Sequence, residues 1–158
     1  MKKCKILLVE DNPDDEMLCL RALKKNNITN EIVIAHDGAE ALDYLFADDS
    51  HAESADELPH LMLLDLKLPK VSGLEVLERV RANPRTKLLP TVILTTSVEE
   101  QDLLQSYSLG VNSYIRKPVD FAEFTEVVRQ LGLYWLLLNQ NPQGGTCEDE
   151  YTASAPRR

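Results

Sequence analysis

Short apolar runs alternate with segments of helical periodicity along most of this chain, and this alternation restricts its fold more than any other feature. The runs expected to form strands are Lys5–Val9, Glu31–Ala35, Leu61–Leu64, Thr91–Thr95 and Ser113–Ile115. The segments expected to form helices are Asp14–Lys25, Gly38–Phe46, Gly73–Arg81, Val98–Leu109 and Phe121 to about Leu138. Strands that alternate with helices form a parallel sheet covered on both faces, and right-handed crossovers restrict it to a doubly wound α/β sandwich.

Polar residues at the expected helix starts support these boundaries. Asn12-Pro13 offers a capping side chain followed by proline at the first helical position, where a missing N–H costs nothing. Four further starts place a capping oxygen three residues before a glutamate, which is the pattern of a capping box. These pairs are Asp37 and Glu40, Ser72 and Glu75, Ser97 and Glu100, and Asp120 and Glu123.

The length of 158 residues fits a single domain, expected over residues 1–138. The acidic, polar segment Asp48–Leu58 is predicted to be an exposed loop between the second helix and the third strand. Residues 139–158 are rich in polar residues, glycine and proline, so we expect a disordered C-terminal tail and no attached output domain.

The charge balance of the chain indicates which classes of partner it can bind. Acidic residues outnumber basic ones 26 to 17, giving a net charge of −9, whereas nucleic-acid binding needs a basic face. No apolar run reaches the roughly 18 residues of a membrane span, and the basic N-terminus is too short in its apolar part for a signal peptide. We therefore expect a cytoplasmic protein with a cation site or a basic protein partner, and neither nucleic-acid nor membrane binding.

The cysteines Cys4, Cys19 and Cys147 are scattered along the chain, without a C-x-x-C pair. Such a set argues against a disulfide framework and against a zinc site. Cys4 and Cys19 are expected to pack as small hydrophobic residues.

Charged and hydroxyl side chains lie at or just beyond the carboxyl ends of four of the five expected strands. Glu10 and Asp11 follow the first strand, Asp65 the third, and Lys117 lies just after the fifth, while Thr95 ends the fourth. Ligands of open parallel sheets bind beyond the carboxyl ends of the strands. Each acidic residue alone could be a helix cap or a turn residue, but their joint placement indicates one site.

Clustered carboxylates repel one another unless a cation lies among them, and oxygen-only ligands favour a hard divalent ion such as Mg²⁺. A single lysine cannot neutralise three carboxylates, but its ammonium can hold an oxygen of an incoming phosphoryl group. A threonine hydroxyl can donate to another such oxygen. The set therefore predicts a magnesium-dependent site that carries a phosphoryl group on a carboxylate.

On these residues the chain resembles the receiver domains of two-component response regulators. The matching residues are Glu10-Asp11, Asp65 with Pro69 and Gly73 after it, Thr95, and Tyr114 before Lys117-Pro118. The resemblance covers about Cys4 to Leu137. It implies a flavodoxin-like three-layer sandwich with five helices and a five-stranded parallel sheet of order 2-1-3-4-5.

The resemblance also implies roles for individual residues. Asp65 would be the phosphoacceptor and would ligate Mg²⁺ together with Asp11 and the backbone carbonyl of Lys67. Glu10, where the family also uses aspartate, would reach the ion through water.

Thr95 and Lys117 would hold phosphoryl oxygens, and Tyr114 would be a switch that turns inward when Thr95 is drawn to the phosphoryl group. The Lys117–Pro118 peptide bond would be cis. Thr96 is larger than the residue that often follows the threonine, which leaves the dephosphorylation rate open.

Two other classes of protein use similar residues or topology. A phosphatase or phosphotransferase with an aspartyl-phosphate intermediate commonly needs a second acid two residues after the nucleophile, where this chain has Lys67. A flavin or nucleotide carrier would need a phosphate-binding loop, and no G-x-G-x-x-G or P-loop is present. The signalling phosphoacceptor is the favoured interpretation, so the chain would be a substrate of a sensor histidine kinase and no enzyme in its own right.

The last expected helix is apolar nearly all round, so it must be buried somewhere. Its apolar residues are Leu131, Leu133, Tyr134, Trp135, Leu136, Leu137 and Leu138. We expect a homodimer that uses this helix and the neighbouring surface, against the alternative that the helix packs wholly within its own core. The long polar loop, the Leu-Asp-Leu-Lys-Leu-Pro segment and the Gly-Leu-Tyr-Trp ending resemble the single-domain regulators that are paired with phytochrome-type kinases.

Overall fold

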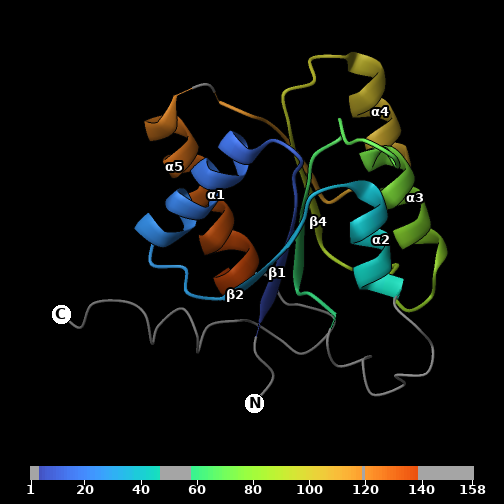
Figure 1. The fold of residues 1–158 in the computed structure, drawn as a ribbon, viewed down its shortest axis with the longest axis horizontal. Helices are drawn as coiled ribbons and strands as arrows, with labels where there is room; N and C mark the ends of the chain where they lie inside the picture. Colours follow the sequence, from blue (N-terminus) through green and yellow to red (C-terminus); the bar gives the residue numbers. More distant parts are fainter. Residues whose placement is uncertain (1–3, 47–57, 119, 139–158) are drawn as a thin grey trace.

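The computed structural model describes residues 4–46, 58–118 and 120–138, and it has the predicted three-layer architecture (Figure 1). Five parallel strands form one sheet in the order β2-β1-β3-β4-β5. The strands are β1 (Lys5–Val9), β2 (Glu31–Ala35), β3 (Leu61–Leu64), β4 (Thr91–Thr95) and β5 (Ser113–Arg116). The helices are α1 (Pro13–Lys25), α2 (Gly38–Phe46), α3 (Gly73–Ala82), α4 (Glu100–Ser108) and α5 (Phe121–Leu131), and α5 continues into the π-helical segment η2 (Gly132–Leu138). Figure 1 shows α1 and α5 on one face of the sheet and α2, α3 and α4 on the other.

The central strands are apolar on both sides because each face of the sheet is covered by helices. In β1, Ile6 and Leu8 belong to the core under α1 and α5, whereas Leu7 and Val9 belong to the core under α2 and α3. The strands β3 and β4 follow the same alternation, as the two-residue period of a strand requires. Side chains that continue this alternation past the strand ends therefore fall on a defined face of the sheet.

Most helix starts follow the predicted capping chemistry. Asn12 caps α1 by accepting from the backbone N–H groups of Asp14 and Asp15, and Asp120 caps α5 in the same way. The capping oxygens of Asp37 and Ser72 likewise accept from the residue three positions on.

The prediction for α4 is wrong by two residues. The helix starts at Glu100, and its N-cap residue Glu99 makes no side-chain capping bond. The Ser97 hydroxyl accepts from the Glu99 N–H but donates to Asp102 at 2.6 Å, so it ties the loop before α4 to the first turn of the helix. This bond replaces the expected capping box with Glu100.

The end of the chain's last helix is partly buried within the domain itself. Leu131 and Leu136 lie in the core under α1 and α5, and Trp135 packs against that core, whereas Tyr134 is 52% exposed. The α-helix ends at Leu131 and not near Leu138, because η2 has π-helical bonding. Gly132, at this junction, packs closely against Ile28, because a Cβ atom there would lie 2.6 Å from the Ile28 Cδ1 atom.

Three further expectations have different outcomes. Cys4 and Cys19 both pack in the core as predicted, but Cys4 is disulfide-bonded, against the expectation of no disulfide, whereas Cys19 is free. No peptide bond between described residues is cis, so the cis Lys117–Pro118 bond is not found. The expected loop at 48–58 lies outside the described residues apart from Leu58, and so does the expected tail at 139–158.

In the described part of the chain, no helix combines the length and apolarity that crossing a membrane requires.

Candidate functional site

Three carboxylates gather at the carboxyl end of the sheet because β1 and β3 are adjacent and end in register, with Val9 opposite Leu64. One oxygen from each of Glu10, Asp11 and Asp65 lies within 4.8 Å of the others. Glu10 and Asp65 are buried and Asp11 is exposed, so the cluster opens to solvent on one side. The predicted acidic set is therefore assembled as the sequence indicated.

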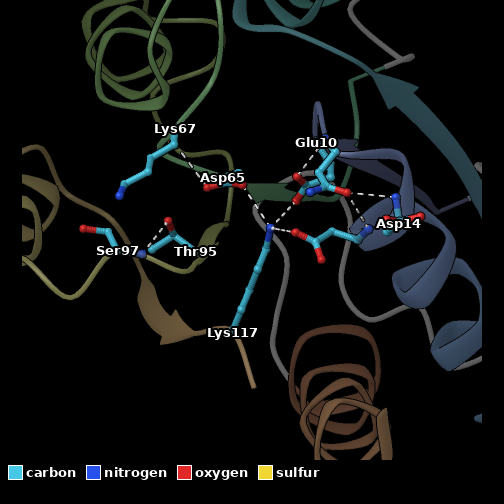
Figure 2. Close-up of polar contacts among 9 residues, drawn as sticks. Glu10, Asp14, Asp65, Lys67, Thr95, Ser97 and Lys117 are labelled. Carbon is cyan, nitrogen blue, oxygen red and sulfur yellow. Dashed lines mark hydrogen bonds and ion pairs between the residues drawn. The ribbon is translucent and has the colours of Figure 1, made fainter. Parts of the chain in front are cut away.

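The ammonium of Lys117 enters this cluster from the loop after β5 (Figure 2). Its Nζ atom donates to Glu10 Oε2 at 2.5 Å, to Asp65 Oδ2 at 2.9 Å and to Asp15 Oδ2 at 3.0 Å. The lysine side chain is only 4% exposed.

Burial and charge act against each other in this cluster. Burial raises the pKa of the Glu10 carboxyl to about 7, although the hydrogen bond from Lys117 opposes the rise. Burial by itself would lower the pKa of the Lys117 ammonium, but its bond to Glu10 and the charge of Asp65 raise it above the ordinary lysine value. Lys117 therefore stays protonated at neutral pH, and its bond to Glu10 opposes the effect of burial on that carboxyl.

The loop after β3 presents Asp65 to the site. The second carboxylate oxygen of Asp65 accepts from the backbone N–H of Lys67 at 3.2 Å. Gly73, at the start of α3, packs directly on the Asp65 peptide, because a Cβ atom there would lie 2.2 Å from the Asp65 carbonyl oxygen. The Lys67 side chain is exposed. Its backbone carbonyl as a metal ligand stays a prediction.

Thr95 and Tyr114 lie on the other face of the sheet from Lys117. Thr95 is fully buried, and its hydroxyl oxygen accepts from the backbone N–H of Ser97 at 3.2 Å. Figure 2 shows Thr95 and Ser97 on one side of Asp65 and Glu10 on the other. The predicted threonine is thus at the same edge of the sheet as Asp65.

The Tyr114 hydroxyl is buried and has no hydrogen-bond partner of good geometry in the described part of the chain. The ring packs against the core under α2 and α3. Burial raises the pKa of this phenol, and the neighbouring Asp102 carboxylate adds to the rise, while nearby Ser97 opposes it. The Tyr114 hydroxyl is thus buried in the protein without a phosphoryl group, and its role as an aromatic switch stays a prediction.

Two contributors were not identified from the sequence. Asp15 binds Lys117 from the first turn of α1, and Asp102 binds Ser97 from the first turn of α4. No helical spacing marked Asp15, because Asp11, four residues before it, precedes the N-cap residue Asn12 and lies outside α1. No sequence signal marks Asp102 either, since its partner depends on where α4 begins.

The donor set of the cluster consists of carboxylate oxygens, which fits a hard divalent cation better than a soft or redox-active one. Glu10, Asp11 and Asp65 would hold such an ion. Three negative charges close together, with only one ammonium between two of them, leave a surplus that a cation would neutralise.

The fold and the site together define a class of signalling domain. A family model for the response regulator receiver domain matches residues 6–129. The chain belongs to this family, whose members are generally signalling proteins that interact with sensor kinases.

Two curated relatives match almost end to end. The chain is 43% identical over 137 residues to a probable methanogenesis regulatory protein, FilR2, of Methanothrix harundinacea, covering 87% of this chain and 86% of the relative. It is 40% identical over 131 residues to response regulator Rcp1 of a Synechocystis strain, covering 83% and 88%.

Solved structures show the same likeness. The phosphorylated cyanobacterial phytochrome response regulator RcpA superposes with a TM-score of 0.81 at 38% identity, covering 89% of this chain and 99% of RcpA. The Mn²⁺-bound form of Rcp1 gives 0.79 at 38% identity, covering 88% and 99%. The chain is thus a homologue of phytochrome response regulators.

Proposed function

We propose that this protein is a response regulator that accepts a phosphoryl group on Asp65 from a sensor histidine kinase, with Mg²⁺ bound beside it. The observation that carries the proposal is the contact of Asp65 with the Lys117 ammonium at 2.9 Å inside a cluster of three carboxylates. Asp65 is a buried carboxylate that lies beside a lysine ammonium and within a carboxylate cluster able to hold a cation. Such surroundings are suited to stabilise an additional negative group on it.

In the proposed reaction, an oxygen of the Asp65 carboxylate attacks the phosphorus of a kinase phosphohistidine. The new P–O bond forms as the P–N bond breaks, and the imidazole nitrogen keeps the electron pair. Lys117 holds one oxygen of the transferred group and offsets part of its charge. Thr95 donates its hydroxyl to another oxygen, and Asp11 and Glu10 complete the cation site. Mg²⁺, when bound, neutralises charge on the phosphoryl oxygens.

The direct test is phosphorylation by acetyl phosphate in the presence of Mg²⁺, followed by phosphate-affinity electrophoresis. We expect the wild type to shift and Asp65→Asn to stay unshifted, because the amide is a poor nucleophile. Asp14→Asn is the matched control, since Asp14 is an exposed acid near the site that makes no side-chain contact with Lys117. Labelling of Asp65→Asn at the wild-type rate would contradict the assignment.

A phytochrome-type kinase is the partner class that we propose. Support comes from the likeness to RcpA, a cyanobacterial phytochrome response regulator. FilR2, the methanogenesis regulator at 43% identity, gives the competing outcome, a kinase with a different input. A phosphotransfer screen with purified kinases decides between them, because the cognate kinase should transfer much faster than the others. The cytoplasmic location stays a prediction.

A homodimer through the C-terminal helix region is the assembly that we propose. Leu131 and Leu136 are used within the domain, so the remaining surface is the groove of β5, α5 and η2, lined by Ile115, Val127, Tyr134 and Trp135 among others. The exposed Tyr134 ring packs edge-on against Trp135, with 5.0 Å between ring centroids. Such an aromatic pair beside a largely apolar groove suits a protein interface.

Tyr134→Glu tests this interface by placing a charge in it. We expect the sedimentation coefficient of the variant to fall to that of a monomer. Tyr107→Glu, on α4, is the matched control, because Tyr107 is 53% exposed and Tyr134 is 52% exposed. A wild-type protein that sediments as a monomer at all concentrations tested would contradict the dimer.

A further inference from the structure

The Lys117 ammonium has all of its donors engaged before any phosphoryl group arrives. A lysine ammonium carries three N–H donors, and Lys117 contacts three carboxylates: Glu10, Asp65 and Asp15. To hold a phosphoryl oxygen, the ammonium must exchange one of these partners. The exchange leaves two carboxylates to keep the lysine in place.

Asp15 differs from the other two carboxylates in position and in use. Glu10 and Asp65 follow strands and belong to the carboxylate cluster that would hold the cation. Asp15 lies in the first turn of α1 and outside that cluster. Its side chain is 30% exposed, compared with 4% for Glu10 and 7% for Asp65. Asp15 is therefore the one lysine partner of the three that would neither bind the cation nor receive the phosphoryl group.

We propose that Asp15 is a positioning residue for phosphoryl transfer, which keeps the Lys117 ammonium aimed at Asp65 while the other two carboxylates serve the cation. This inference rests on the proposed function. When the group arrives on Asp65, the lysine shifts its Asp65 bond to a phosphoryl oxygen and retains Asp15 as an anchor.

The physical need for such an anchor follows from the lysine itself. A lysine side chain has four rotatable bonds and an ammonium without fixed orientation, unlike an arginine fork. Lys117, Cys19 and Phe124 are among the residues that line a cavity of only about 10 Å³, so the buried stem has little room to move. Asp15 adds a contact to the tip from a carboxylate outside the cluster of Glu10, Asp11 and Asp65.

Two variants of Asp15 separate its hydrogen bond from its charge. Asp15→Asn keeps an acceptor oxygen and removes the charge, whereas Asp15→Ala removes both. We expect Asp15→Ala to lower the initial rate of phosphorylation by acetyl phosphate about tenfold at saturating Mg²⁺, because small misplacements of a catalytic group cost one to two orders of magnitude. Asp15→Asn should stay within about threefold of wild type, because its amide oxygen still accepts from the lysine.

Asp14→Ala is the matched control, because it makes the same change of charge in the same helical turn without a contact to Lys117. Its rate should equal that of wild type. Figure 2 shows Asp14 on the same helix with no dashed line to the lysine. Because Asp15 is partly exposed, we expect the melting temperatures of the variants to stay close to that of wild type, so that changes in rate do not arise from unfolding.

Calorimetric titration with MgCl₂ adds a second measurement, because replacing a metal ligand would weaken Mg²⁺ binding. We expect the Mg²⁺ dissociation constant of Asp15→Ala to stay within about threefold of wild type, because Asp15 bonds to Lys117 and lies outside the carboxylate cluster. Loss of Mg²⁺ affinity, a wild-type rate for Asp15→Ala, or an equally slow Asp15→Asn would each overturn the inference. A wild-type protein that takes up no phosphoryl group at all would instead overturn the proposed function.

Discussion

The Lys117 ammonium lies 2.9 Å from Asp65 Oδ2, although 52 positions separate the two residues in the chain. The strand order places β4 between the strands that carry them, so the lysine reaches across the end of a neighbouring strand. Both side chains fall on the face covered by α1 and α5, since Leu63 and Ile115, two residues before each, pack against that core. One electrostatic contact therefore links the two halves of the site on one face of the sheet.

Replacing Lys117 by methionine should destabilise the protein at neutral pH. The methionine keeps most of the stem's volume but leaves buried Glu10 and Asp65 without their counter-charge. Removing one partner of a buried ion pair typically costs roughly 3–5 kcal/mol. Urea unfolding at pH 8 without divalent cations measures the free energy of unfolding. Lys67→Met is the control, since Lys67 is an exposed lysine at the same end of the sheet. This substitution should change the free energy of unfolding little.

The destabilisation by Lys117→Met should depend on pH in a direction that the Glu10 carboxyl sets. Burial already raises the pKa of this group from 4.5 to about 7, and loss of the lysine removes an opposing influence. A raised carboxyl pKa means that the folded state binds the proton more tightly than the unfolded state. The loss of stability should therefore be small below about pH 4.5 and grow as the pH rises through 7. A loss that shrinks with rising pH would contradict this account.

Magnesium should stabilise the wild type through the carboxylate cluster. At a concentration one hundred times the dissociation constant, one bound ion adds about 2.7 kcal/mol to the free energy of unfolding. Asp11→Asn should raise the melting temperature of the metal-free protein by relieving repulsion, and should lose most of the stabilisation by Mg²⁺. Thermal unfolding with and without MgCl₂ measures both effects. Asp14→Asn should keep the wild-type response, because Asp14 is outside the cluster.

The sequence predicted most of the site because strand ends can be identified from apolar runs alone. Once Glu10, Asp65 and Lys117 were placed after their strands, the topology brought them together. The two-residue alternation even separates Lys117 from Tyr114, which face opposite sides of the sheet. Predicting these positions from strand ends and from the two-residue alternation requires no knowledge of side-chain packing.

Contacts that depend on helix placement could not be predicted in the same way. Asp15 reaches Lys117 only because α1 packs beside α5 and turns its first turn toward the sheet end. Ser97 was assigned to a capping box, but its bond to Asp102 competes with that pattern. The close packing of Gly132 against Ile28 at the junction between α5 and η2 is likewise a tertiary contact, which no periodicity of the sequence encodes.

Gly73→Ala should damage both stability and phosphorylation. Its Cβ atom would lie 2.2 Å from the carbonyl oxygen of Asp65, so the peptide that presents the acceptor must move. Overpacking of this kind costs about 1–3 kcal/mol, and a displaced acceptor should slow phosphorylation at least tenfold. Urea unfolding and acetyl phosphate labelling measure the two effects.

Gly38→Ala is the control for this change, since its Cβ atom would lie 2.0 Å from the carbonyl oxygen of Val71. The steric conflict is equally severe, but the displaced peptide is not that of Asp65. We expect a comparable loss of stability with labelling of the folded protein much closer to wild type. Equal labelling defects in both variants would show that general loosening, and not the Asp65 peptide, limits the reaction.

Tyr114→Phe should stabilise the unphosphorylated protein or leave it unchanged. The hydroxyl is buried without a well-formed hydrogen bond in the described residues, so its removal relieves an unsatisfied polar group and is worth up to about 1 kcal/mol. Because burial raises the pKa of this phenol, its contribution to wild-type stability is present below pH 10 and falls above it, where the unfolded phenol ionises first. Tyr114→Phe should therefore lose less stability than wild type in strong alkali. Urea unfolding across this pH range checks both statements, with Tyr107→Phe as the exposed control, and a clear loss of stability at pH 7 would mean that the hydroxyl has a binding partner after all.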